Sequence, residues 1–261
     1  MRTSSTGHRD RPRSWPVPAA LTALSAIPLT AGTLRLVQLA GGPPVMPADD
    51  RFTGFPAALV VHIVGATVFA LVGAFQLVPR IRRRHRVWHR RAGRVLTVAG
   101  LLVAGSALWL TLFYAPQPGT GHLLYGLRLV FASAMAGCLV LGFTAIRRRD
   151  IAAHRAWMTR GYAIGLAAGT QAFTEGIGGA LFGAGELRDD LAKAAGWVIN
   201  LAVAEWVVRH PTRSQHRSIA RAARRPGTLQ EDSDEHDLRD PGRRPPRRPL
   251  VGVARRPDRQ P

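Results

Sequence analysis

The stretch RRRDIAAHRAWMTRGYAIGLAAGTQAF, which runs from Arg147 to Phe173, contains the transition that decides the fold. It begins as a run of arginines and turns into a segment of small apolar residues, with no proline between the two parts. His154 and Trp157 lie at the transition, and Asp150 is suited to capping the start of a helix. A basic run that leads straight into an apolar segment is typical of the border between water and a lipid bilayer. We therefore expect this stretch to enter a membrane as a helix, with a histidine at the membrane surface.

The composition divides the chain of 261 residues into an apolar middle and two polar, arginine-rich ends. The formal net charge is +20, and Lys193 is the only lysine. The middle shows repeated apolar runs near the ~20 residues that a membrane-spanning helix needs, whereas a soluble domain would show long polar helix faces. The single cysteine, Cys138, lies inside one of these runs, which excludes a disulfide framework. The sequence thus predicts an all-α, polytopic membrane helix bundle.

We expect six transmembrane helices in a domain that covers residues 17–208. A basic segment precedes it at residues 1–16, and a tail at residues 209–261, rich in Arg, Pro and Asp, should be disordered. The first apolar run could instead be a secretory signal peptide, but no small-x-small cleavage motif ends it, which favours a retained helix. The expected spans are Val17–Leu39, Ala57–Pro79, Val95–Tyr114, Leu123–Ile146, Gly161–Phe182 and Ala192–Val208.

The distribution of arginines between the connections predicts the orientation. Alternate connections hold few positive charges: GGPPVMPADDRFTGFP has only Arg51, APQPGTGH has none, and GAGELRDDLAK has Arg188 and Lys193. Basic connections stay on the cytoplasmic side, so both termini are expected inside, in a bacterial plasma membrane. The basic segments contain Arg2, Arg9, Arg11 and Arg13, then Arg80, Arg82, Arg83, Arg84, Arg86, Arg90, Arg91 and Arg94, then Arg147, Arg148, Arg149, Arg155 and Arg160.

Polar side chains within the spans need a reason, because a charge deep in a bilayer costs ~2.5–3.5 kcal/mol on insertion scales. Arg128 and Glu175 are read either as an ion pair that fixes helix packing or as part of a binding site. For His62 we favour a function, since an apolar residue would pack there without needing a partner. At a rise of ~1.5 Å per residue, five side chains fall together in the outer half of the predicted bundle: Arg35, His62, Arg128, Gln171 and Glu175.

Two segments that approach the membrane from the basic side read alike, RVWHRRAGRV and AHRAWMTRGYAIG. They predict that His89 and His154 lie at similar heights at the cytoplasmic face. An interfacial anchor made of Arg, Trp and His explains the tryptophans and arginines well, but explains two matched histidines less well. The arginines there are suited to lipid phosphates or another anion. Near the inner end of the last span, Glu205 can neutralise Arg94 or Arg160.

Three pieces of the chain resemble a bacterial membrane family known as domain of unknown function 2306. They are VHIVGATVFALVGAFQLVPRIRRRHRVWHRRAGRVL, RRRDIAAHRAWMTRGYAIGLAAGTQAF and GWVINLAVAEWVV, and together they run from about Leu59 to Val208. The second piece is the most specific, with His-Arg-x-Trp-Met followed by an arginine and Tyr162. The family has no established activity, so the resemblance implies a membrane architecture more than a mechanism.

A more distant resemblance, of pattern only, is to the ascorbate-dependent six-helix transmembrane cytochromes b, which place one histidine on each of four central helices. Here His62 and His122 would be the outer pair, and His89 and His154 the inner pair. The resemblance implies bis-histidine b-type haem and electron transfer across the membrane, with a quinol or an ascorbate-like donor as partner. His85, four residues before His89, leaves the inner ligand ambiguous.

Two other functions stay open. A transporter without redox chemistry would use His62, Arg128 and Glu175 as a proton- or anion-sensitive site, and the glycine-rich fifth span could unwind. A structural subunit would use small residues for close helix contacts. The sequence has no Walker loop, Rossmann glycine pattern, Cys-x-x-Cys or Gly-x-Ser-x-Gly, so it leaves open whether the protein is an enzyme. The glycines that would allow close helix contacts are Gly65, Gly73, Gly100, Gly105, Gly165 and Gly169.

The expected partners follow from the bilayer and from the charge. They are the lipids themselves, anionic headgroups at the cytoplasmic face, and a quinone or another small molecule. Nucleic acid is not expected, because the basic tail has neither interleaved aromatic residues nor a recognisable binding fold.

Overall fold

A computed structural model describes residues 16–47, 49–52, 56–117 and 119–210, and these residues form eight helices. The predicted basic N-terminal segment (residues 1–16) and C-terminal tail (residues 209–261) lie outside the described residues except for Pro16, Arg209 and His210. The helices are α1 (Pro16–Leu39), α2 (Ala57–Gln76), α3 (Pro79–Arg84), α4 (Arg86–Phe113), α5 (His122–Arg147), α6 (Ile151–Gly165), α7 (Ala167–Phe182) and α8 (Glu186–Arg209).

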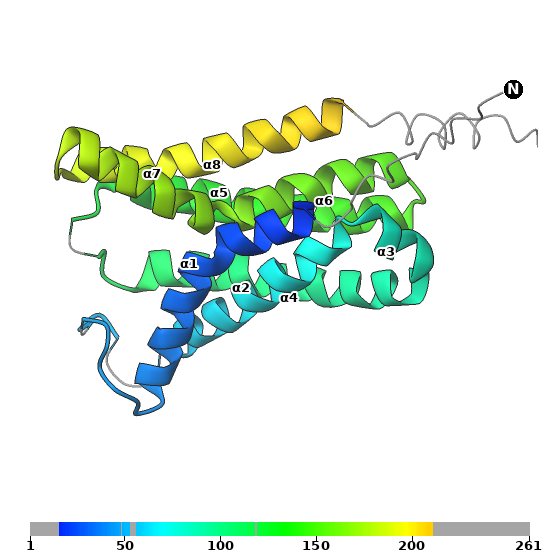
Figure 1. The fold of residues 1–261 in the computed structure, drawn as a ribbon. Coiled ribbons are helices and arrows are strands. Elements are labelled where there is room, and N and C mark those ends of the chain that lie inside the picture. Colours follow the sequence, from blue (N-terminus) through cyan, green and yellow to red (C-terminus); the bar gives the residue numbers. More distant parts are fainter. Residues whose placement is uncertain (1–15, 48, 53–55, 118, 211–261) are drawn as a thin grey trace, which may run out of the picture. The chain divides into compact units, whose positions relative to one another are not determined.

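The long helices pack side by side in a bundle (Figure 1). Three pairs of helices make the most extensive contacts, α2 with α4, α5 with α6, and α7 with α8, and α4 also packs on α5. Helix α1 lies against α2 and α7, and Figure 1 shows it changing direction along its length, in keeping with Pro28 in its interior. We call the end that holds segments 77–94 and 146–160 the arginine-rich end. The arginine-poor end holds residues 40–47, 49–52, 114–117, 119–121 and 183–186.

Large apolar side chains cover the outside of this bundle. Val98 is 58% exposed, Trp206 64% and Phe182 76%, whereas the core contains Phe69, Met135, Leu139 and Tyr162. Soluble monomers rarely expose contiguous apolar surface on this scale, but a bilayer covers it without cost. The distribution of apolar side chains therefore agrees with the predicted membrane location.

Five of the helices are long and apolar enough to cross a membrane: α1, α2, α4, α5 and α8. The fifth predicted span, Gly161–Phe182, is not one continuous helix, because α6 ends at Gly165 and α7 begins at Ala167. The predicted total of six transmembrane helices is therefore not confirmed. The sequence also gave no sign of the short α3, and α4 and α8 each begin several residues earlier than their expected spans.

A polar clip from α8 stabilises the break between α6 and α7. Asn200 Nδ2 donates a hydrogen bond to the Ala163 carbonyl at 3.0 Å, and the Thr170 hydroxyl donates to Asn200 Oδ1 at 2.7 Å. Ala163 lies before the break and Thr170 after it, so one side chain holds both halves. Within lipid an unsatisfied backbone carbonyl costs several kcal/mol, and Asn200 supplies the donor that water would supply elsewhere.

Small residues allow the close helix contacts that the sequence predicted. The clearest case is Gly73 on α2, where a Cβ atom would overlap the ring of Tyr162. The Tyr162 hydroxyl donates to the Ala70 carbonyl at 2.8 Å, so α6 is held on α2 by both packing and a hydrogen bond. Neighbouring side chains or backbone similarly crowd Gly65, Gly100, Gly165 and Gly169, whereas Gly105 faces open space and was wrongly included.

Replacing Asn200 by alanine tests the clip. We expect a loss of ~1–2 kcal/mol in the free energy of unfolding, because two interhelical hydrogen bonds at ~0.6 kcal/mol each are lost and the Ala163 carbonyl loses its donor. Unfolding by SDS in mixed micelles would measure it. Thr97→Val is the matched control, since the Thr97 hydroxyl bonds only to the Gly93 carbonyl of its own helix. Equal stability of the two variants would contradict the role of Asn200.

Candidate functional site

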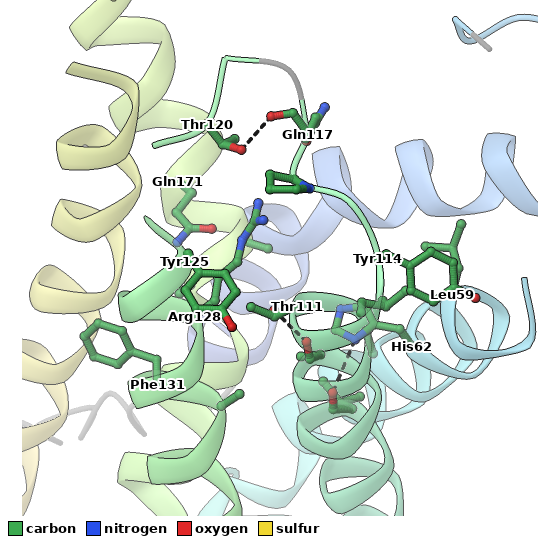
Figure 2. Close-up of a pocket in the computed structure, with 18 of the residues that line it drawn as sticks. Leu59, His62, Thr111, Tyr114, Gln117, Thr120, Tyr125, Arg128, Phe131 and Gln171 are labelled. Carbon is green, nitrogen blue, oxygen red and sulfur yellow. Dashed lines mark hydrogen bonds between the residues drawn. The ribbon is translucent and has the colours of Figure 1, made fainter. Parts of the chain in front are cut away.

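A cavity of about 730 Å³ lies at the arginine-poor end of the bundle. Its walls come from α2, α4, α5, α8 and the junction of α6 and α7, with Arg35 from α1. Residues 49, 51–52, 114–117 and 120–121 of the connections border it. Most of the lining is apolar, including Phe131, Met135 and Trp197. The rings of Phe131 and Trp197 stack, with centroids 4.6 Å apart. Figure 2 shows the polar side chains that reach into this apolar space.

His62 presents one ring nitrogen to the cavity because α4 engages the other. Its Nδ1 lies 3.3 Å from the Val103 carbonyl and 3.1 Å from the Ser106 hydroxyl oxygen. The Ser106 hydroxyl donates its own proton to the Leu102 carbonyl at 2.6 Å. Nδ1 therefore carries the proton, and Nε2 is left as an acceptor on a residue that lines the cavity.

Arg128 is a half-buried cation of the cavity without an ion-pair partner among the described residues, whereas Glu186, which also lines the cavity, is exposed. Arg128 lies in the second turn of α5 and forms none of the ion pairs or side-chain hydrogen bonds found among the described residues. Figure 2 shows its side chain beside Gln171 and below the connection that holds Gln117 and Thr120, with His62 on the facing side. Asp190 and Glu175 attract it only through space.

The nearby Arg51, by contrast, is neutralised. Its Nε donates to Asp49 Oδ1 at 2.7 Å and its Nη2 to Asp49 Oδ2 at 2.5 Å, a bidentate pair within one connection. The Arg51 guanidinium holds the pKa of the Asp49 carboxyl below its ordinary value through these hydrogen bonds, so the pair stays ionised near neutral pH. Arg35 is bound too, to the Pro47 carbonyl at 3.2 Å and to Gln38. These contacts distinguish both cations from Arg128.

A buried carboxylate on α8 fixes the start of α5 and so the position of Arg128. Asp190, 1% exposed, accepts hydrogen bonds from the backbone N–H groups of Gly121 at 3.2 Å and Leu124 at 3.0 Å. These donors lie at the N-terminus of α5, where intrahelical acceptors are lacking and negative charge is favoured. A Cβ atom at Gly121 would lie 2.5 Å from Asp190 Oδ2, so only glycine fits there.

The structure brings together four of the five side chains predicted for the outer tier. Arg35, His62, Arg128 and Gln171 all line the cavity. Glu175 is not among the lining residues and lies 3.4 Å from Lys193 instead. The anticipated ion pair between Arg128 and Glu175 is therefore wrong: α7 directs Glu175 toward α8, on which it packs closely.

At the arginine-rich end the structure pairs Arg160 with Glu205, one of the two partners that the sequence allowed. The Arg160 Nε lies 2.5 Å from Glu205 Oε1, and its guanidinium also stacks over the Trp157 ring at 4.9 Å. Asp150 caps α6 as predicted, accepting from the Ala153 N–H at 2.9 Å. The Nδ1–H of His154 donates to the Gly142 carbonyl at 2.8 Å.

The four histidines predicted as haem ligands fall into two separate places. His62 and His122 both line the cavity, His122 as the first residue of α5. His89 and His154 lie at the arginine-rich end, close enough for His154 to act electrostatically on His89. Among the described residues no group of three or more His, Cys, Asp or Glu side chains is placed to hold a metal ion.

Three residues that matter for the site were not predicted. Asp190, Ser106 and Asn200 all act on backbone groups or on another side chain across helices. Asp190 stood in a polar connection that was read only for its charge, and Asn200 stood in a piece used only for the resemblance. The sequence does show each of them as a single polar residue in or next to an apolar helix. Their partners could not be predicted, because these depend on which helices pack together.

Long helices with an apolar exterior are the features of a multi-pass integral membrane protein. A family model described as "Predicted membrane protein (DUF2306)" matches residues 59–208, which is more than half of the chain. The chain therefore belongs to this family, as the resemblance indicated. Neither a curated protein nor a solved structure matches the chain.

The carboxylate of Asp190 is expected to be needed for the shape of this site. Asp190→Asn keeps the volume but gives up one of two acceptor oxygens, so one buried N–H loses its partner and the free energy of unfolding falls by ~1–3 kcal/mol. Thermal unfolding in detergent would measure the change. Asp189→Asn is the control, because Asp189 pairs only with its neighbour Arg188. A drop of the same size in the control would refute this assignment.

Proposed function

We propose that this protein binds a small amphipathic organic anion in the cavity, with Arg128 as the countercharge. The observation that carries the proposal is a guanidinium group in a mostly apolar cavity without a carboxylate partner among the described residues. A cation in such surroundings is costly unless an anion neutralises it. Its planar set of donors matches a carboxylate or a phosphate.

The other lining groups support an amphipathic ligand. Gln171 uses its amide nitrogen to donate to the Lys193 carbonyl at 3.0 Å, which leaves its oxygen as an acceptor beside Arg128. His62 Nε2 is a second acceptor, suited to a hydroxyl or to a protonated acid. Phe131 and Trp197 give an aromatic wall for the apolar part. A volume of about 730 Å³ lies within the usual range of small-molecule sites.

The proposed orientation places this site on the outer side of a bacterial plasma membrane. The arginine-rich end would face the cytoplasm, because basic connections are retained there. The cavity lies at the other end and would be reached from outside. The broken pair α6 and α7, part of which lines the cavity, is of the kind that transporters use at their substrate sites. Uptake or sensing of an anion from outside is therefore the function that we favour.

Benzoate, with benzyl alcohol as an uncharged analogue, tests the role of Arg128. We expect benzoate to raise the melting temperature of the purified protein by several degrees, since 1 kcal/mol of ligand stabilisation shifts it by ~2–4 °C in a protein of this size. Arg128→Gln should lose this shift, and Arg128→Lys should keep part of it. Differential scanning fluorimetry in detergent is the measurement.

Arg35→Gln is the matched control. Arg35 lines the same cavity, but the Pro47 carbonyl and Gln38 already bind it, so its loss should leave the benzoate shift nearly unchanged. An equal shift with benzyl alcohol would show an apolar site without a role for the charge. A benzoate shift that persists in Arg128→Gln would overturn the proposal.

Binding of b-type haem is a second candidate, favoured by one observation. Nδ1 of His62 and Nδ1 of His154 each make a hydrogen bond, which leaves Nε2 of both rings available. Histidines that bind a metal usually have their other ring nitrogen held by a hydrogen bond in this way. A bound haem would supply one-electron transfer, and His122 and His89 would be the respective partners. A dithionite-reduced minus oxidised spectrum of protein expressed with ample haem should then show a sharp alpha band that His154→Ala diminishes. A flat spectrum would eliminate this candidate.

A further inference from the structure

The arginine-rich end contains a second group of cations without acidic partners. In segments 77–94 and 146–160 the only acidic residue is Asp150, and its side chain caps α6. Glu205 of α8 is shared between Arg160 and Arg209. The remaining arginines of both segments form none of the ion pairs found in the described part of the chain. This end thus holds much more positive charge than the protein itself neutralises.

Within this group Arg82 stands apart, because α3 holds it partly inside the protein. It is half-buried, whereas its neighbours Arg83 and Arg84 are exposed. Arg155 of α6, also half-buried, is close enough to repel it. Burial and the nearby guanidinium groups of Arg155 and Arg83 lower the pKa of Arg82. Two half-buried guanidinium groups from different helices are brought together although their charges oppose it.

Two buried polar atoms without a partner lie at the same end of the bundle, on α2 and α4. Gln76 Oε1 and His89 Nδ1 make no hydrogen bond to any described residue. They are neighbours, because Gln76 Nε2 lies 3.5 Å from the His89 carbonyl. Arg82 and His154 both act electrostatically on His89. The imidazole of His154 is oriented by its bond to the Gly142 carbonyl. Buried polar atoms are nearly always paired, so these two call for an explanation.

We propose that the ends of α2 and α4, together with α3 and α6, form a binding site for a phosphate ester that carries a hydroxyl group. Arg82 and Arg155 would bind the phosphate oxygens, and His89 and His154 would border the site. The hydroxyl would donate to Gln76 Oε1, which no arginine of the described chain reaches. A bare anion would neutralise the arginines but would leave that acceptor unsatisfied. The combination selects a phosphate with a hydroxylated substituent.

The place of the site in the fold favours a lipid headgroup as the source. Short helix α3 joins two membrane-spanning helices, so it lies where the chain leaves the apolar layer. Val87 and Trp88, both exposed, follow directly and suit the level of the headgroups. The site is at the other end of α2 from His62 and the cavity, and it depends on neither Arg128 nor the ligand proposed there.

Short-chain phosphatidylglycerol added to the full-length protein in a neutral detergent tests the site. The comparison lipid is phosphatidylmethanol, which has the same charge and no hydroxyl group. We expect phosphatidylglycerol to bind more tightly, as measured by native mass spectrometry of the detergent complex. Arg82→Gln and Arg155→Gln should each weaken its binding about tenfold, which is roughly the value of one charge-assisted hydrogen bond. Gln76→Leu should abolish the preference over phosphatidylmethanol while leaving phosphate binding in place.

Arg84→Gln is the matched control, since Arg84 lies on the same short helix but is exposed. If it weakens binding as much as Arg82→Gln, the attraction is diffuse and the site is refuted. Equal binding of the two lipids to the unaltered protein refutes the hydroxyl contact. Glycerol 3-phosphate, tested alone, separates the sources: binding at similar strength assigns the site to soluble phosphate esters, and binding of the lipid only assigns it to headgroups. Arg128→Gln should bind phosphatidylglycerol normally, so this site and the cavity can fail separately.

Discussion

The absence of water from a bilayer is the constraint on which this structure depends, because every backbone group inside the apolar layer needs a partner within the protein. Continuous helices satisfy it by themselves, and five helices here are long enough to do so. The pair α6 and α7 does not, since it is interrupted at Leu166. Asn200 makes the interruption tolerable by donating to the Ala163 carbonyl and accepting from Thr170. The shape of the α6 and α7 pair therefore depends on Asn200 of α8.

The same need for a partner inside the protein divides the cationic side chains into two groups. Arg51, Arg160 and Lys193 have carboxylate partners inside the protein, so their presence near the bundle is explained by packing. Arg128 and Arg82 have none among the described residues, although both are half-buried. An unneutralised cation is a poor packing element, and two of them at opposite ends of the bundle indicate two different places where the protein meets an anion. The distinction rests on partners, since all five cations look alike in the sequence.

The sequence was sufficient for what local chemistry determines. Apolar runs and arginine segments predicted the long helices, and α5 was expected at Leu123–Ile146 and found at His122–Arg147. Depth along a helix correctly grouped His62, Arg128 and Gln171, because a constant rise per residue converts position into height. The direction in which each side chain points around the helix axis could not be predicted in this way. Glu175 has the right height but points toward Lys193, and the carboxylate that shapes the site, Asp190, comes from a helix whose neighbours only the packing reveals.

The break at Leu166 and the cavity belong together. Ile164, Gly165 and Ala167 line the cavity, so the interrupted backbone itself forms part of the wall. Gln171, five residues after Leu166, lines the same cavity from α7. Asn200 does not line the cavity itself, but its hydrogen-bond partners Ala163 and Thr170 flank the stretch of lining residues at the break. The polar clip and the unneutralised arginine are parts of one arrangement, in which α8 fixes both the start of α5 through Asp190 and the break through Asn200.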